Sequence, residues 1–255
     1  MKKIIQLISL ATILTLSTTQ VKCEWIKKGE TKDFKTIGNG GWALDKNGYP
    51  WQWSETDDWV KKDKIVLSSS QQKEYALADS TQLKFTDITN SYAINGNKFY
   101  SYKERNVQET KINAWLMESE SELSFKVIAL DEKIADTVYL VDINNNLYKN
   151  NVLISNNYKF EGVGTNGWAL GNLEKETTRN KIYQYTETKK WEELGSGFKK
   201  IGGIWAIGDG KSDKKNEKAY QYEKENWVQK SEKTFKDISG DGWAVGKDTF
   251  IYRWE

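Results

Sequence analysis

The sequence predicts an all-β fold built from one repeated unit, and three observations lead to this prediction. A phrase of the type Phe-Lys-x-Ile, followed by glycines and Trp-Ala-Val, recurs along the chain and is clearest from Phe235 to Val245. The period is nearly fixed, because 37 residues separate Trp168 from Trp205 and 38 separate Trp205 from Trp243. The apolar residues of a repeat alternate or form short bursts, as in strands, without the 3.6-residue period of a helix. A four-stranded antiparallel unit of this length is the blade of a β-propeller.

Each repeat predicts four strands in order. Strand A is the Phe-Lys-x-Ile segment, and a glycine-rich turn leads into strand B, the short buried run Trp-Ala-Val. Strand C is an alternating pair of aromatic residues, and strand D begins at a further tryptophan. In chain order the markers are Trp25 (D); Phe34 (A), Trp42 (B), Trp51–Trp53 (C) and Trp59 (D); Phe160, Trp168, Tyr183–Tyr185 and Trp191; Phe198, Trp205, Tyr220–Tyr222 and Trp227; and Phe235, Trp243 and Tyr252–Trp254. Of the twelve tryptophans only Trp115 lies outside these repeats, so we expect the tryptophans mainly to pack between blades.

The length predicts a six-bladed propeller. The 231 residues from Trp25 to Glu255 hold about six repeats of this period. The last repeat ends at Trp254, directly after strand C, whereas Trp25–Lys28 resembles a strand D that lacks a blade. We therefore expect the N-terminal strand to complete the last blade and close the ring, which removes an exposed edge strand.

Between Trp59 and Tyr158 the repeat is eroded, and the blade count depends on this region. Four hairpins are predicted here: Tyr75–Ala78 with Leu83–Phe85, Tyr92–Ile94 with Tyr100–Tyr102, Trp115–Met117 with Leu123–Phe125, and Tyr139–Val141 with Leu147–Tyr148. Taken in pairs, the hairpins form two blades and give six in total. Taken partly as three-stranded blades, they give seven, and the sequence leaves this alternative open.

The start of the chain predicts a secretory signal peptide at residues 1–23. A basic start, Met1–Lys3, precedes an apolar run from Ile4 to Leu16, which is shorter than the roughly 20 residues that span a bilayer. Cys23 would suit the lipid attachment of a bacterial lipoprotein, but Lys22 stands where that modification needs a small residue. We therefore expect cleavage after Cys23. A single mature domain at 24–255 follows, because the chain has one proline and no stretch typical of a linker. This predicts a secreted or cell-surface protein with no membrane span.

Charge and residue content argue against several functions. Removal of the signal peptide takes away Lys2, Lys3 and Lys22, so that 38 basic and 36 acidic residues become 35 and 36, which gives no electrostatic case for nucleic acid. The chain has no histidine, hence no Ser-His-Asp triad and no histidine metal site. The segment Asp142–Asn146 resembles the start of a calcium loop but lacks its glycine and distal glutamate, so we interpret it as a hairpin turn. No acidic residue stands out as half of a glycosidase pair. We therefore predict no catalytic residue, no metal and no cofactor.

The repeated phrase resembles the tectonin repeat. The match covers Trp25–Trp59 and Tyr158–Glu255, a little over half of the mature chain, and is weak from Lys61 to Asn157. Tectonins are six-bladed propellers, and many are secreted or surface lectins that bind glycans or bacterial lipopolysaccharide around the ring. The resemblance implies a carbohydrate-recognition protein; it is more specific for the fold than for the ligand, because the repeated residues are those that build blades.

Two functions from different classes are compatible with these residues. Sugars bind to aromatic faces with polar groups beside them, and multivalency on a glycan-coated surface would strengthen weak repeated sites. The candidate carbohydrate-binding residues are Trp42, Trp168, Trp205 and Trp243, with Asn39, Asn166 and Asp241 in the adjacent turns. The alternative is a non-catalytic structural or interaction component of an extracellular or cell-surface assembly, since half of the ring has lost the repeat. Exposed strand-B rings in similar pockets would favour a lectin, and fully buried rings together with one large apolar patch elsewhere would favour a protein partner.

Overall fold

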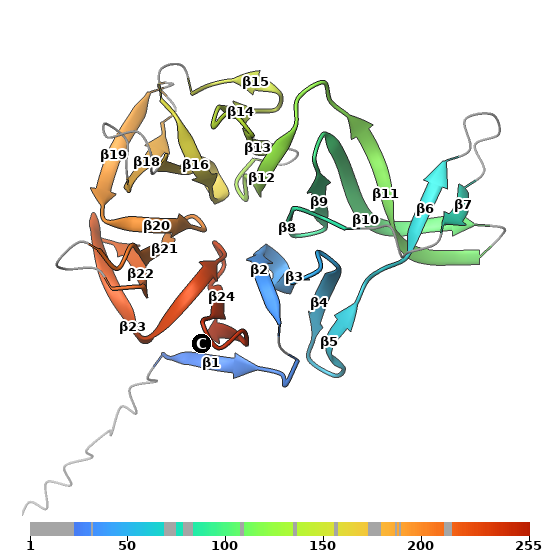
Figure 1. Cartoon of the computed structure of the whole chain (residues 1–255), viewed down its shortest axis with the longest axis horizontal. Coiled ribbons are helices and arrows are strands. Elements are labelled where there is room, and N and C mark those ends of the chain that lie inside the picture. Colours follow the sequence, from blue (N-terminus) through green and yellow to red (C-terminus); the bar gives the residue numbers. More distant parts are fainter. Residues whose placement is uncertain are drawn as a thin grey trace, which may run out of the picture.

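The structure is a computed structural model that describes residues 23–31, 33–68, 75–78, 84–107, 110–134, 137–155, 158–172, 180–186, 188, 190–211 and 216–255. Its strands are arranged as a β-propeller around a central axis (Figure 1), with 61% of residues in strands and 3% in helices. The all-β propeller prediction is thus confirmed. Apart from Cys23, the predicted signal peptide lies outside the described residues.

Four of the five sheets each contain four consecutive antiparallel strands, and these sheets correspond to blades. The first is β2 (Phe34–Gly38), β3 (Trp42–Asp45), β4 (Pro50–Ser54) and β5 (Asp58–Lys61). The second is β8 (Asp87–Thr89), β9 (Tyr92–Asn95), β10 (Lys98–Val107) and β11 (Thr110–Glu120). The third is β12 (Phe125–Leu130), β13 (Val138–Asp142), β14 (Leu147–Lys149) and β15 (Val152–Leu153). The fourth is β16 (Phe160–Val163), β17 (Trp168–Gly171), β18 (Lys181–Tyr185) and β19 (Trp191–Ser196).

The fifth sheet is continuous and has seven strands, in the order β1-β25-β24-β23-β22-β21-β20. Its strands are β20 (Phe198–Ile201), β21 (Trp205–Gly208), β22 (Lys218–Glu223), β23 (Asn226–Ile238), β24 (Trp243–Gly246), β25 (Ile251–Trp254) and β1 (Trp25–Lys28). The strand β23 pairs with β22 along its first part and with β24 from Phe235 onward. Four separate blades are therefore found rather than the expected six or seven, because no loop interrupts β23 where a strand D would pass into the next strand A.

The N-terminal strand lies where the sequence predicts. The strand β1 pairs antiparallel with β25, with Trp25 opposite Trp254. The main chains of Glu24 and Glu255 exchange two hydrogen bonds, at 2.7 and 3.1 Å between N and O. The ring is therefore closed by strands from the two ends of the described chain (Figure 1).

In the eroded region two predicted hairpins are confirmed and two are wrong. Tyr92–Ile94 pairs with Tyr100–Tyr102, and Tyr139–Val141 pairs with Leu147–Tyr148. Tyr75–Ala78, which is β7, instead pairs with β6 (Ile65–Ser68), and residues 79–83 lie outside the described residues. The third hairpin, Trp115–Met117 with Leu123–Phe125, fails because β10 and β11 form one long hairpin. The β6–β7 hairpin adds to the outer edge of β11, with β6 parallel to it, and lies outside the ring (Figure 1).

The innermost strands share the pattern Phe-x-x-Ile or Phe-x-x-Val, which places both apolar residues in the core despite their odd spacing. In a regular strand residues three apart face opposite sides. A register shift follows the phenylalanine in β2, β12, β16, β20 and β23, as in a β-bulge, where two residues oppose one. Phe34 and Ile37 are therefore both buried. The pattern occurs at Phe34, Phe85, Phe125, Phe160, Phe198 and Phe235, so it extends into the eroded region.

Tryptophans join neighbouring blades, as the sequence predicts. A strand-B ring packs against a strand-D ring of the next blade, with ring centroids 5.3 Å apart for Trp42 and Trp115 and 5.8 Å apart for Trp168 and Trp227. Trp115 thus occupies a strand-D position rather than lying outside the repeats. The indole N–H of Trp115 donates to the main-chain oxygen of Lys62 at 2.7 Å, and those of Trp59, Trp191 and Trp227 make equivalent bonds. The buried Nε1 of Trp25 has no acceptor among the described residues.

Candidate functional site

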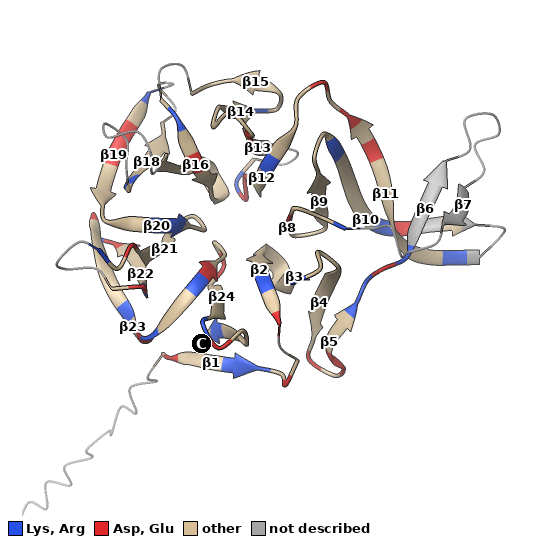
Figure 2. Cartoon of the chain, in the orientation of Figure 1, with Lys and Arg blue, Asp and Glu red and all other residues tan. Residues whose placement is uncertain are grey.

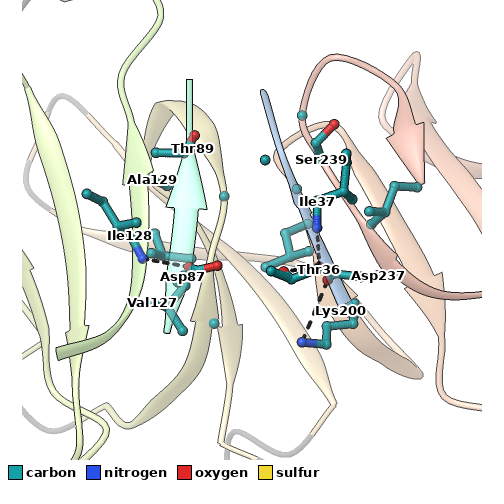
Figure 3. Close-up of a pocket in the computed structure, with 18 of the residues that line it drawn as sticks. Thr36, Ile37, Asp87, Thr89, Val127, Ile128, Ala129, Lys200, Asp237 and Ser239 are labelled. Carbon is teal, nitrogen blue, oxygen red and sulfur yellow. Dashed lines mark hydrogen bonds and ion pairs between the residues drawn. The ribbon is translucent and has the colours of Figure 1, made fainter. Parts of the chain in front are cut away.

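The inner strands enclose a central cavity of about 470 Å³. Its walls come from β2, β8, β12, β16, β20 and the end of β23, so every inner strand contributes (Figure 3). The third residue of each Phe-x-x-Ile pattern lines this cavity. These residues are Thr36, Asp87, Val127, Gly162, Lys200 and Asp237, and we call them the channel ring.

One side of the channel ring is a hydrogen-bonded ion pair. Asp237 is buried and accepts hydrogen bonds from the hydroxyl of Thr36 and, at 2.9 Å, from the main-chain N–H of Ile37. The Nζ atom of Lys200 lies 3.7 Å from the other oxygen of Asp237, and this carboxylate raises the pKa of Lys200. Since both of these hydrogen bonds run from β2 to β23, Asp237 joins the first blade (β2–β5) to the seven-stranded sheet that contains both β1 and β25.

Asp87 is the other carboxylate of the channel ring and has a different environment. Its Oδ2 atom accepts a hydrogen bond from the main-chain N–H of Ile128 at 2.9 Å, which joins β8 to β12. The second oxygen points into the cavity (Figure 3). Burial raises the pKa of Asp87 to about 7, with a smaller contribution from the negative charge of Asp237, whereas the N–H of Ile128 acts to lower it.

The four predicted tryptophans lie in blade interfaces. Trp42, Trp168, Trp205 and Trp243 are each only 3–4% exposed, so their rings offer little surface to a ligand. Their part in carbohydrate binding stays a prediction. Four of the strand-C aromatics are half-buried and lie against these rings, with centroid separations of 5.1–6.1 Å: Tyr102 on Trp42, Tyr222 on Trp168, Trp254 on Trp205, and Trp53 on Trp243.

The predicted polar residues connect the turns between strands A and B. Asn39 is buried; its Oδ1 accepts from Gly240 N at 2.8 Å, and its Nδ2 donates to Glu132 at 2.6 Å. Asp241 is exposed and accepts from Gly40 N at 2.7 Å. The structure thus brings Asn39 and Asp241 together across one interface. Asn166 lies in a different turn, where its Oδ1 accepts from the main-chain N–H of Glu132 at 2.8 Å.

Sequence reasoning missed the channel ring and the half-buried strand-C aromatics. Aligning all six Phe-x-x-Ile or Phe-x-x-Val segments, including those at Phe85 and Phe125, would have placed Asp87, Lys200 and Asp237 at one position of the repeat. The second aromatic of strand C was recognised as part of the repeat, but not as the more exposed of the two in β18, β22 and β25.

No metal centre is found in the described part of the chain, since no group of three acidic or cysteine side chains gathers there. Asp142 forms the expected turn: it is buried, and its carboxylate accepts hydrogen bonds from the main-chain N–H groups of Asn144 and Asn146, both at 2.8 Å. Charged residues of both signs are spread around the ring (Figure 2). Among the described residues, no helix has the length and apolar character needed to cross a membrane.

Comparisons with protein-family models, with curated proteins and with solved structures found no match to this chain.

Proposed function

We propose that the chain is a secreted, non-catalytic propeller of six blades that binds surface glycans at repeated sites between blades, as its resemblance to tectonins implies. The six-blade count follows if the seven-stranded sheet is divided within β23. One blade is then β20–β22 with the first part of β23, and the other is the last part of β23 with β24, β25 and β1. The six Phe-x-x-Ile or Phe-x-x-Val segments support this division, because each supplies one inner strand.

The observation that carries the glycan proposal is the repeated position of half-buried aromatics at the blade interfaces. Trp53, Tyr102, Tyr222 and Trp254 each lie on a buried ring, which holds them in one orientation at little further entropic cost. Ordered aromatic surface beside polar groups is the arrangement that sugar rings require. Several such positions on one rigid ring would act together on a glycan-coated surface.

Glycine turns bring polar groups near two of these aromatics. A Cβ atom added to Gly41 would lie 3.0 Å from Trp53, and one added to Gly242 would lie 3.4 Å from Trp254. Gly41 and Gly242 belong to the turns that hold Asn39 and Asp241, so the predicted polar residues lie in segments adjacent to these rings. The proposed glycan site therefore contains the predicted turns, with the strand-C aromatics as its stacking surface in place of the strand-B tryptophans.

A glycan-array screen of the mature protein, followed by a tryptophan-fluorescence titration of each glycan that binds, tests this proposal. We expect saturable binding that Tyr222→Ala and Trp254→Ala weaken at least fivefold. Tyr158→Ala removes a half-buried aromatic away from these positions and should change affinity less than twofold. Thermal melting of each variant verifies folding. No saturable binding to bacterial or eukaryotic glycans, or equal losses in all three variants, would contradict the proposal.

The burial of the four strand-B tryptophans meets one of the two conditions for the second function, a structural or interaction component of an extracellular assembly; the other condition is a large apolar patch elsewhere. If this is the function, the indole rings of strand B only hold the blades together. The sequence of β6–β11 then differs from the repeat because this region contacts one protein partner. This function can be tested by chemical cross-linking of the protein in the extracellular material into which it is secreted, followed by identification of the linked peptides. A reproducible cross-link from β10 or β11 to one protein, together with no glycan binding, would establish it in place of the lectin.

A further inference from the structure

The channel ring of the central cavity contains two carboxylates, Asp237 and Asp87, and only Asp237 has both an ion pair and two hydrogen bonds. Asp237 has a clear structural role, because it accepts two hydrogen bonds from β2 and pairs with Lys200. Asp87 has the main-chain N–H of Ile128, but its second oxygen points into the cavity (Figure 3), and no ion pair joins it to a lysine or arginine in the described part of the chain. Asp87 is half-buried, and a carboxylate partly withdrawn from water is unfavourable unless a cation or several hydrogen-bond donors compensate it.

The walls of the cavity differ in polarity around the axis. The channel ring is polar on β2, β8, β20 and β23 and apolar on the two adjacent strands β12 and β16, where Val127 and Gly162 stand. Gly162 has no side chain and leaves space on that side; a Cβ added there would meet its nearest neighbour only at 3.7 Å. Ile128 and Ala129 also line this side but are each only 4% exposed, so the apolar surface comes mainly from Val127. A complementary ligand has one cationic end and a short apolar body.

We propose that the central cavity is a second binding site, which takes a small organic amine and pairs its ammonium group with the carboxylate of Asp87. The volume favours an organic cation over a bare metal ion, since about 470 Å³ far exceeds one ion and a calcium ion needs about six to eight oxygen ligands. An ammonium group needs only one good carboxylate and a few further acceptors.

The other charged groups around the cavity leave Asp87 as the best partner for a cation. Lys126 pairs with Glu161 at 3.2 Å, so that acid is already compensated. Lys200 pairs with Asp237 on β23. The strand β2 contacts both β23 and β8, which contains Asp87, so Thr36 of β2 lies between the two carboxylates in the order of the inner strands. Two further lysines line the cavity: Lys199 pairs with Glu217 at 2.5 Å, and the Nζ atom of Lys35 donates to the main-chain oxygen of Phe85 at 3.5 Å. Within the channel ring alone, the charges of Asp87, Lys200 and Asp237 sum to one negative charge when all three are ionised, and an ammonium group would neutralise that charge. Such a ligand would also recover the free energy that burial of the Asp87 carboxylate costs.

The test is calorimetric titration of the whole mature chain with n-propylammonium chloride at pH 8, where Asp87 is ionised. We expect saturable binding of one equivalent. The neutral isostere 1-propanol and sodium chloride at the same ionic strength should give none. Asp87→Asn should weaken the binding at least tenfold. The matched variant Glu161→Gln, which alters another cavity-lining acid, should keep affinity within about threefold.

Thermal melting and circular dichroism establish that both variants are folded. Equal affinity of wild type and Asp87→Asn, or a response to sodium chloride as large as that to the amine, would overturn the proposal. The glycan proposal does not depend on this result, because its aromatic positions lie between blades rather than in the cavity, and glycan binding measured in Asp87→Asn separates the two.

Discussion

Replacing Asp87 by asparagine should stabilise the protein at neutral and alkaline pH. Asparagine keeps an oxygen that can accept the hydrogen bond from Ile128 N, now 2.9 Å long, but it carries no charge into the cavity. The pKa of Asp87 rises from an ordinary 3.8 to about 7 on folding, mainly because of burial. At roughly 1.4 kcal/mol for each pKa unit, the upper limit is about 4 kcal/mol. Water in the cavity lowers this, so we expect a gain of about 1–3 kcal/mol.

The pH dependence has a definite sign. Because the folded state holds the proton of Asp87 more tightly than the unfolded state, the contribution of this group is most favourable below pH 4. It is lost progressively as the pH rises towards 7. Asp87→Asn lacks this titration, so its stability relative to wild type should increase between pH 4 and 7 and then become constant. The other acids titrate in both proteins, so their contribution cancels in the difference between the two free energies of unfolding.

Urea unfolding at pH 4.5, 6 and 8 measures this difference. Glu161→Gln serves as the control, since Glu161 also lines the cavity but pairs with Lys126. We expect no comparable gain at pH 8 from that change. A free-energy difference between Asp87→Asn and wild type that is the same at all three pH values would refute the reasoning. So would a variant that is less stable than wild type at pH 8.

Three further predictions concern the ring closure, the indole hydrogen bonds and the turn glycines. Deleting Trp25–Lys28 should lower the melting temperature by roughly 10 °C or more, because a buried indole and an edge strand are lost; an unchanged value would argue against closure by this strand. Trp227→Phe should cost about 1–2 kcal/mol more than Trp25→Phe in urea unfolding, since only Trp227 donates its indole N–H to a carbonyl; equal costs would contradict this. Gly38→Ala should cost more than about 3 kcal/mol, because its Cβ would lie 2.2 Å from a main-chain oxygen of the next blade. Gly96→Ala meets no atom within 4 Å and should cost only about 1 kcal/mol for its positive φ, so similar melting temperatures of the two alanine variants would count against the close packing.

Local patterns in the sequence predicted the strands of the repeat well. Strands B and C were recognisable because short aromatic and β-branched runs between glycines have few other stable conformations. Strand D was recognised only where it began with a tryptophan in the expected place. Trp115 was missed because β10 and β11 are much longer than the other strands, which moves this tryptophan away from the usual spacing. The β6–β7 hairpin was mispaired for a related reason, since strand pairing across an insertion has no local signal.

The candidate sites depended more on the fold than on the sequence. Because side chains alternate along a strand, the two aromatic residues of Tyr-x-Tyr lie on the same face. This alternation does not indicate which of the two the neighbouring blade covers. In the structure the first tyrosine of two strands C, Tyr183 and Tyr220, is buried, and the second, Tyr185 and Tyr222, is half-buried. The burial of the strand-B tryptophans has the same origin, because each is covered by a blade that its own repeat does not contain.

The sequence by itself determined the all-β class and the repeat, since both follow from local periodicity. It also determined the strand that closes the ring, because the last repeat lacks a strand D and Trp25–Lys28 resembles one. Only the tertiary structure decided which residues meet at the axis. Asp87, Lys200 and Asp237 are separated by up to 150 residues, and they share one cavity because each inner strand places the same repeat position at the same height. The charge balance of that ring, and with it the pKa of Asp87, is a property of strands brought together by closure and is not encoded in any one repeat.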